Sequence, residues 1–221
     1  MKELRTILAV RPVHIPQRFN EIAQALFSNF HIQKGAVRYD FLELEFYYYN
    51  QEHEDIITYP RTTQVGEWFI HSSGLDLSFE SKMSYTSKGE IDYDRSYYGG
   101  VLLRCLLKTE QGKHTVINGP RKCLFELFNH SLNVFDDTFD RLPQVVLGGP
   151  KEKIDVHTTI RQIPNIEQKK KTYRLSDEEF KQLKQHNCYF RHSRFVPNNW
   201  VNTETKQTYS GTLPWKRLLK K

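Results

Sequence analysis

The chain has 221 residues, a net charge of +6 and an aromatic content of 13%. This length accommodates one large domain or two small ones, and 38% hydrophobic residues suffice for a sizeable core. No apolar run approaches membrane-spanning length, and residues 1–5 lack the apolar stretch of a signal peptide. We therefore expect a cytoplasmic protein without membrane association.

Cysteine and histidine usage gives no sign of a disulfide framework or a metal site. Cys105, Cys123 and Cys188 are widely spaced and odd in number, which is typical of a reducing compartment. The nine histidines occur without a C-x-x-C or H-E-x-x-H motif, so we expect no metal and no cofactor.

Charge is unevenly distributed. Residues 151–221 contain 16 Lys and Arg against 7 Asp and Glu, a balance of +9, whereas residues 1–150 contain 16 against 19, a balance of −3. A basic C-terminal third on a mildly acidic body indicates a polyanion-binding surface. Ordinary lysine-rich solubility is the alternative.

The first half of the chain alternates between periodic and irregular segments. Residues 17–29 have the apolar spacing of an amphipathic helix, and residues 37–49 have the alternation of a strand. Residues 50–66 form a polar loop, residues 68–79 a hairpin with a Ser-Ser-Gly turn, and residues 81–98 an irregular insertion.

The second half begins with an apolar strand at residues 101–107, followed by a helix at about residues 120–130. Further elements are expected as strands at 144–149 and 156–163, a helix at 176–185 with a capping box, and an alternating aromatic and basic segment at 188–196. No repeat or linker interrupts the pattern. We therefore predict one mixed domain over residues 1–221, which includes the basic third.

The strand at residues 41–49 carries the most informative pattern. Alternation places Glu43, Glu45 and Tyr47 on one face. The opposite, apolar face consists of Leu42, Leu44, Phe46 and Tyr48. The two glutamates are either a solvated strand face or the centre of an acid–base site, and the tyrosines are either stacking groups or core aromatics.

Two further charged positions stand out. Arg104 lies in the middle of the apolar strand, where a guanidinium requires a carboxylate, carbonyls or water as partners. A structural salt bridge is the alternative to a functional role. Arg121 and Lys122 lie in the first turn of the helix that follows Gly119, where backbone amides and two cations attract an anion.

Four segments, in this order, resemble the alkyladenine DNA glycosylases over roughly residues 17–130. Residues 42–47 (LELEFY) are similar to V-E-T-E-A-Y of that family, and residues 66–71 (GEWFIH) to G-T-L-Y-V-Y. Residues 101–104 (VLLR) match V-L-L-R, and residues 118–122 (NGPRK) are similar to S-G-P-x-K at a helix start.

The resemblance implies roles for individual residues. Glu45 would activate the attacking water, Arg104 would help to hold that water, and Tyr47 would stack on the flipped base. His53 is the closest match to a family histidine that faces the same base. His71 replaces the aromatic second wall of the base pocket, which is a departure from the family.

Other positions are implied with less detail. Asp76 and Glu80 either line the base pocket or alternate outward on the hairpin. The family carries a bulky aromatic at the hairpin tip, where this chain has Ser72, Ser73 and Gly74, so the residue that fills the gap in the duplex is unassigned. The expected DNA contacts are Ser72, Ser73, Gly119, Arg121, Lys122, Arg191 and Arg194.

The fold implied by the resemblance is an α+β domain with a curved, mostly antiparallel sheet flanked by helices and a protruding hairpin. The implied activity is that of a monomeric, monofunctional DNA glycosylase, because no lysine or N-terminal proline stands in the motifs as a Schiff-base nucleophile. Such an enzyme flips a modified base out of double-stranded DNA and hydrolyses its N-glycosidic bond, which leaves an abasic site.

Three alternatives remain from the sequence. The altered pocket is compatible with hypermodified bases of phage DNA, which would make the protein a defence enzyme rather than a repair enzyme. A non-catalytic nucleic-acid-binding module would not need Glu45. An enzyme acting on a nucleotide or small glycoside would use the same carboxylate without the basic C-terminal third.

Overall fold

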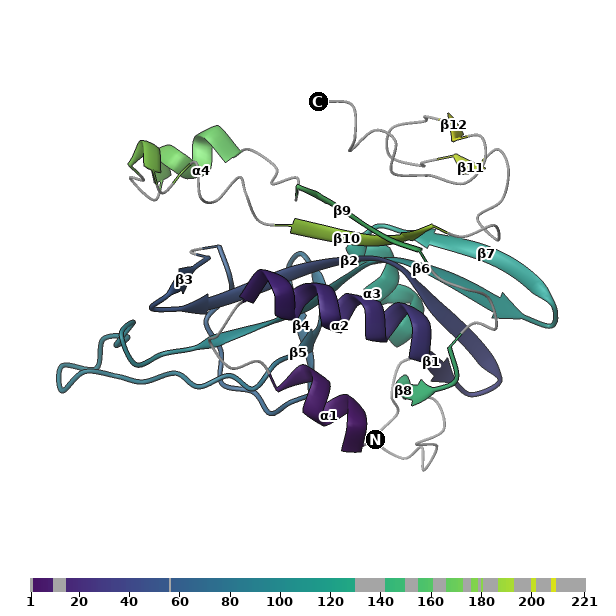
Figure 1. Cartoon of the computed structure of the whole chain (residues 1–221), viewed down its shortest axis with the longest axis horizontal. Coiled ribbons are helices and arrows are strands. Elements are labelled where there is room, and N and C mark those ends of the chain that lie inside the picture. The colour runs from purple at the N-terminus through teal and green to yellow at the C-terminus, as the bar shows by residue number, and fades with distance from the viewer. Residues whose placement is uncertain are drawn as a thin grey trace.

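A curved antiparallel sheet organises the protein in the computed structural model (Figure 1). The structure describes residues 2–9, 15–55, 57–129, 142–149, 155–160, 166–172, 176–178, 180, 187–192, 200–201 and 208–209. The helices are α1 (Lys2–Leu8), α2 (Ile15–Asn29), α3 (Pro120–Phe128) and α4 (Ile166–Thr172). This arrangement confirms the predicted α+β class.

Strands β1 to β10 form one sheet, in which β4, β5, β6, β2, β1 and β8 follow one another in space. The N-terminal strands are β1 (Phe30–Lys34), β2 (Val37–Asn50), β3 (His53–Glu54), β4 (Trp68–His71) and β5 (Gly74–Ser78). The others are β6 (Tyr98–Glu110), β7 (Lys113–Asn118), β8 (Gln144–Leu147), β9 (Asp155–Ile160) and β10 (Asn187–His192). A separate pair joins β11 (Trp200–Val201) to β12 (Thr208–Tyr209).

The long strand β2 is the centre of the sheet. It pairs with β6 along almost its whole length and with β1, β10 and β3 in turn along its other side. Helix α2 lies across β2, and its apolar stripe packs against that strand (Figure 1). The ring centroid of Phe19 in α2 is 4.7 Å from that of Phe46 in β2.

The faces of β2 differ from the predicted alternation at one place. The register between β2 and β6 shifts around Glu43, so the core face is formed by Tyr39 and Phe41 before the shift and by Leu44, Phe46 and Tyr48 after it. Leu42 is buried but lies outside this core cluster, which corrects its predicted place beside Leu44. Such an irregularity exchanges the two sides of a strand because side chains alternate with period two.

The other predicted elements have mixed outcomes. The helices at α2 and α3, the β4–β5 hairpin and the strands β6, β8 and β9 are confirmed, and residues 81–97 form an arm that projects from the sheet (Figure 1). The helices α1 and α4 and the strands β1, β3, β7, β10, β11 and β12 were not predicted, and β3 lies within the expected polar loop. Most of the expected helix at 176–185 lies outside the described residues.

Candidate functional site

Glu45 lies at the centre of a buried polar group on the side of β2 that faces away from α2. Its side chain is only 3% exposed, and the Tyr47 hydroxyl donates a hydrogen bond of 2.8 Å to its Oε2. The Nε of Arg104 is 3.6 Å from Glu45 Oε1 and also 3.6 Å from Glu43 Oε1. One guanidinium therefore serves two buried carboxylates, which offsets part of the cost of removing them from water.

A second acidic group lies on the same face, two strands away. Glu45 pairs with Leu102 of β6, and Leu102 pairs with Asp76 of β5. Residues opposite each other in antiparallel strands project from the same face, and two strand spacings separate the backbones by about 10 Å. Glu45 and Asp76 therefore lie on one surface of the sheet, with Leu102 between them.

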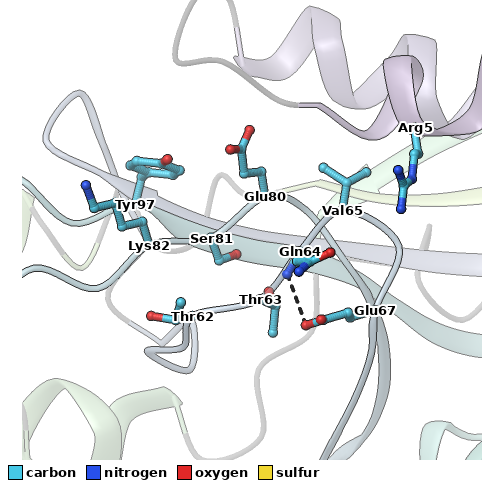
Figure 2. A pocket seen from close by; sticks show the side chains of 10 residues that line it. All are labelled: Arg5, Thr62, Thr63, Gln64, Val65, Glu67, Glu80, Ser81, Lys82 and Tyr97. Carbon is cyan, nitrogen blue, oxygen red and sulfur yellow. Dashed lines mark hydrogen bonds between the residues drawn. The ribbon is translucent and has the colours of Figure 1, made fainter. Parts of the chain in front are cut away.

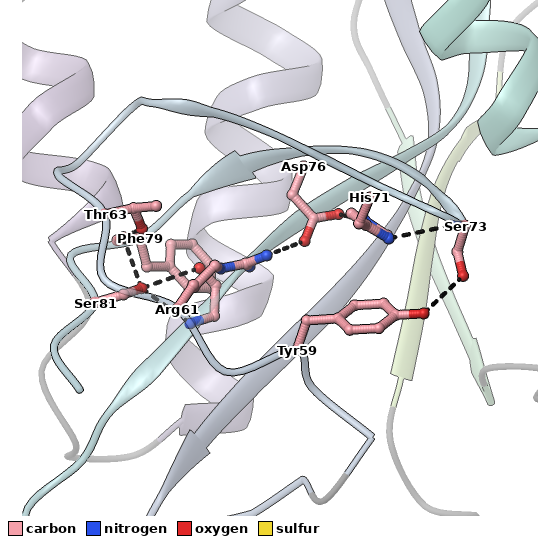
Figure 3. Close-up of polar contacts among 9 residues, drawn as sticks. Tyr59, Arg61, Thr63, His71, Ser73, Asp76, Phe79 and Ser81 are labelled. Carbon is pink, nitrogen blue, oxygen red and sulfur yellow. Dashed lines mark hydrogen bonds and ion pairs between the residues drawn. The ribbon is translucent and has the colours of Figure 1, made fainter. Parts of the chain in front are cut away.

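Asp76 is held by two basic side chains (Figure 3). Arg61 Nη1 is 2.7 Å from Asp76 Oδ2, and His71 Nε2 is 3.0 Å from Asp76 Oδ1. The Ser73 backbone N–H donates to His71 Nδ1 at 3.3 Å, so the proton on this imidazole belongs on Nε2, where it is donated to Asp76. Asp76 thus accepts hydrogen bonds from the Arg61 cation and from His71.

Gly100 provides the space for this arrangement. It lies in register between Tyr47 of β2 and Ser78 of β5. A Cβ at this position would be 2.6 Å from Arg61 Nη2 and 2.8 Å from the backbone oxygen of Leu77. Only a residue without a side chain allows the Arg61 guanidinium to approach the sheet beside Tyr47.

The hairpin tip between β4 and β5 carries a tyrosine that the sequence analysis did not single out. The Tyr59 hydroxyl is 3.1 Å from Ser72 Oγ and 3.2 Å from Ser73 Oγ, and its ring centroid is 4.8 Å from that of His71. Tyr59 is 42% exposed. An exposed aromatic therefore lies over the serines at the tip, supplied by the preceding loop rather than by the hairpin itself.

The hairpin tip lies against the start of α3. A Cβ on Gly74 would be 2.8 Å from the Cβ of Pro120, so the two backbones approach closely there. Arg121 and Lys122 are exposed in the first turn of α3, and the Gly119 N–H donates to the Arg104 carbonyl at 2.8 Å. The structure thus brings together the expected DNA contacts of the tip and of this helix.

The remaining predicted site residues are placed differently. His53 lies on the opposite face, with its ring centroid 5.9 Å from Phe19 and 6.5 Å from Tyr48, because the tight turn between β2 and β3 directs it toward α2. The structure therefore does not bring His53 to Glu45. Arg191 lies in β10, next to the segment of β2 that contains Glu45, and Arg194 lies outside the described residues.

Two hollows in the described part of the chain lie away from Glu45 and Asp76. The larger, of about 620 Å³, is lined by residues of α1, the 62–67 segment and the start of the arm, among them Arg5, Glu67, Glu80 and Lys82 (Figure 2). The smaller, of about 330 Å³, lies between α1 and the β8 region. Glu80 thus belongs to a separate, open hollow, whereas Asp76 belongs to the buried polar face.

Three further properties of the described residues concern membrane helices, metal ligands and thiols. No helix among them is long and apolar enough to cross a membrane, and no cluster of His, Cys, Asp and Glu side chains within them has the arrangement of a metal site. Burial raises the pKa of the Cys105 and Cys123 thiols, which keeps both protonated and unreactive. The acid–base groups on the polar face are carboxylates, guanidinium groups, an imidazole and a phenol.

Comparison of the chain with protein-family models, curated proteins and solved structures finds no match.

Proposed function

We propose that the protein is a monofunctional DNA glycosylase that hydrolyses the N-glycosidic bond of a modified base. The observation that carries this proposal is the buried carboxylate of Glu45, held by the Tyr47 hydroxyl and near Arg104, on the same face as Asp76 and Arg61. A buried carboxylate that is fixed in place by a hydrogen bond is positioned to act as a general base.

In this reaction Glu45 accepts a proton from water while the water oxygen bonds to C1′ of the deoxyribose. The bond from C1′ to the base nitrogen breaks, and its electron pair leaves with the base. Positive charge develops on the sugar ring in the transition state, and the negative charge of Glu45 stabilises it. Arg104 is a positioning residue that orients the carboxylate.

The polar groups around Glu45 support a flipped base as the substrate. A base in a duplex cannot be reached at its glycosidic carbon unless it leaves the stack, and it then needs a flat, enclosed site. Tyr47 offers a ring beside Glu45, and the Arg61 guanidinium occupies the space that Gly100 leaves on the neighbouring strand. Exposed Arg121 and Lys122, close to the hairpin tip, supply contacts for phosphates.

In this proposal the excised base is not the one that an alkyladenine DNA glycosylase removes. His71 is engaged with Asp76 and has its ring centroid 5.6 Å from that of Phe69, so it is not a free flat wall. A site with this altered wall favours other modified bases, and the hypermodified bases of phage DNA are among the candidates.

The test is base release. Duplex DNAs that carry alkylated, deaminated or hypermodified bases are incubated with the protein, and free bases are measured by mass spectrometry. Glu45→Gln should lower the rate by at least about 100-fold, because a general base contributes about that much or more. Glu110→Gln removes a carboxylate that is 51% exposed on β6 and should leave the rate unchanged.

Absence of base release from every DNA would refute the enzyme, and persistent DNA binding would then favour the non-catalytic module. Release by Glu45→Gln at the parental rate would refute the role of Glu45. Equal rates on free nucleosides and on DNA would favour the small-glycoside enzyme.

A further inference from the structure

Arg61 is fixed in the polar face by two contacts that use only part of its guanidinium. Its side chain is 2% exposed, and Nη1 is 2.7 Å from Asp76 Oδ2. Its Cζ lies 4.3 Å from the centroid of the Phe69 ring. An ion pair and a ring contact of this kind hold the plane of the group in one orientation.

The other edge of the guanidinium has no hydrogen-bond partner among the described residues. Nε and Nη2 are both buried, and neither forms a hydrogen bond with the part of the chain that the structure describes. These two nitrogens share one side of the group and present two parallel N–H donors, directed away from Nη1 and Asp76. Buried donors without partners are costly, so a native protein retains them where a ligand completes them.

This edge lies next to the proposed chemistry. Nη2 is 2.6 Å from the Cβ position of Gly100, and Gly100 pairs directly with Tyr47, whose hydroxyl binds Glu45. On the other side, the Ser78 Oγ is also buried without a hydrogen-bond partner among the described residues. Arg61 Nη2 thus lies about one strand spacing, and Ser78 about two strand spacings, from Tyr47, the residue proposed to stack on the base.

The ligand that fits these donors is a neutral molecule with two adjacent hydrogen-bond acceptors on one edge. Asp76 balances the charge of Arg61, which favours a neutral ligand over a phosphate or carboxylate. The O6 and N7 atoms of a 6-oxopurine match two parallel donors, whereas the 6-amino group of adenine places a donor against one of them.

We propose that Arg61 determines base specificity and selects purines with acceptors at both O6 and N7 over 6-aminopurines. The inference rests on the proposed function in assuming that a base enters this site. Asp76 and Phe69 are positioning residues in this scheme, since they fix the plane of Arg61 without contact to the base.

The experiment measures binding in the Glu45→Gln background, so that it does not depend on hydrolysis. Four duplexes carry hypoxanthine, 7-deazahypoxanthine, adenine or 7-deazaadenine opposite thymine, so each deaza pair differs only at position 7. Loss of N7 should weaken hypoxanthine binding by at least about fivefold and leave adenine binding unchanged.

Arg61→Gln should reverse this pattern, because a carboxamide pairs with N6 and N7 of adenine. Arg61→Lys retains a cation for Asp76 but lacks the two parallel N–H donors. It should therefore bind hypoxanthine and 7-deazahypoxanthine equally well. Its melting temperature shows whether the variant is folded. Arg95→Gln, at an arginine that is 81% exposed, is the matched control and should preserve the parental pattern.

Equal binding of hypoxanthine and 7-deazahypoxanthine would overturn the inference, as would an N7 effect that survives Arg61→Lys. Displacement of the hypoxanthine duplex by millimolar inorganic phosphate only when Arg61 is present would assign the edge to an anion and would also overturn it. N7-dependent binding without base release from any DNA would refute the proposed glycosylase and support the role of Arg61, so the two failures are distinguishable.

Discussion

The buried ion pair between Arg61 and Asp76 gives the most direct test of the site's construction. Both side chains are at most 3% exposed, and their closest atoms are 2.7 Å apart. Asp76→Asn removes the negative charge while it keeps the size of the side chain. The Arg61 charge then remains in a dry environment, with Nε and Nη2 already without hydrogen bonds to the described residues.

Breaking a buried pair by removing one partner costs about 3–5 kcal/mol in stability. For a chain of 221 residues this corresponds to a decrease of about 6–20 °C in melting temperature. The assay is urea unfolding followed by tryptophan fluorescence, in which the midpoint should fall without a change in the m-value. The double variant Arg61→Met with Asp76→Asn should recover part of the loss, because no unpaired charge remains.

The exposed pair between Arg18 and Glu21 is the control. Its atoms are 2.9 Å apart, but the side chains are 28% and 48% exposed, so water screens the pair and Glu21→Gln should leave the urea midpoint almost unchanged. A cost for Asp76→Asn as small as that of the control would show that water reaches the pair. It would refute the argument that the polar face is dry and that the free edge of Arg61 needs a ligand.

Three further predictions address other parts of the site. Gly100→Ala should lower stability by about 1–3 kcal/mol in the same urea assay, because the new Cβ would be 2.8 Å from a backbone oxygen that cannot move aside; an unchanged midpoint would contradict the close approach. Arg121→Ala and Lys122→Ala should each reduce the slope of log binding constant against log salt by about one, measured by fluorescence anisotropy with duplex DNA; unchanged slopes would remove α3 from the interface. Native protein treated with iodoacetamide at pH 8 should remain unlabelled at Cys105 and Cys123 in peptide mass spectra, because burial raises the pKa of both thiols, and labelling at the rate of the urea-unfolded control would contradict this.

Periodicity predicted those elements whose burial is one-sided or complete. Helix α2 and strand β6 are examples, since their apolar residues recur at the spacing of a buried stripe or a continuous buried run. Helix α1 has only seven residues and too few turns for a clear period. The register shift around Glu43 was also hidden, because it depends on how β2 meets β6 and not on the composition of either strand.

The site was predictable where its residues share a strand with a regular pattern. Glu45 and Tyr47 follow from alternation, and Arg104 is conspicuous as the charge within an apolar run. Arg61 and Tyr59 come from a polar loop without a period, where nothing local distinguishes them. Asp76 could have indicated Arg61, because a carboxylate on a buried strand requires a cation as its partner. Arg61 lies in the preceding loop, 15 positions before Asp76.

The two acid–guanidinium pairs on the polar face differ in a way that suits separate tasks. Arg104 is 20% exposed and stands 3.6 Å from Glu45, a separation longer than a hydrogen bond, which leaves the carboxylate able to engage water. Arg61 is held at 2.7 Å from Asp76 and is shielded from solvent, so the direction of its free edge is fixed. In this arrangement the carboxylate of Glu45 would act on the sugar, and the rigid N–H donors of Arg61 would bind the edge of the purine. Leu102 lies between Glu45 and Asp76, the partner of Arg61, so hydrolysis and base recognition would use separate groups. On this argument, substitutions of Arg104 should mainly change the rate of base release, whereas substitutions of Arg61 should mainly change which base is bound.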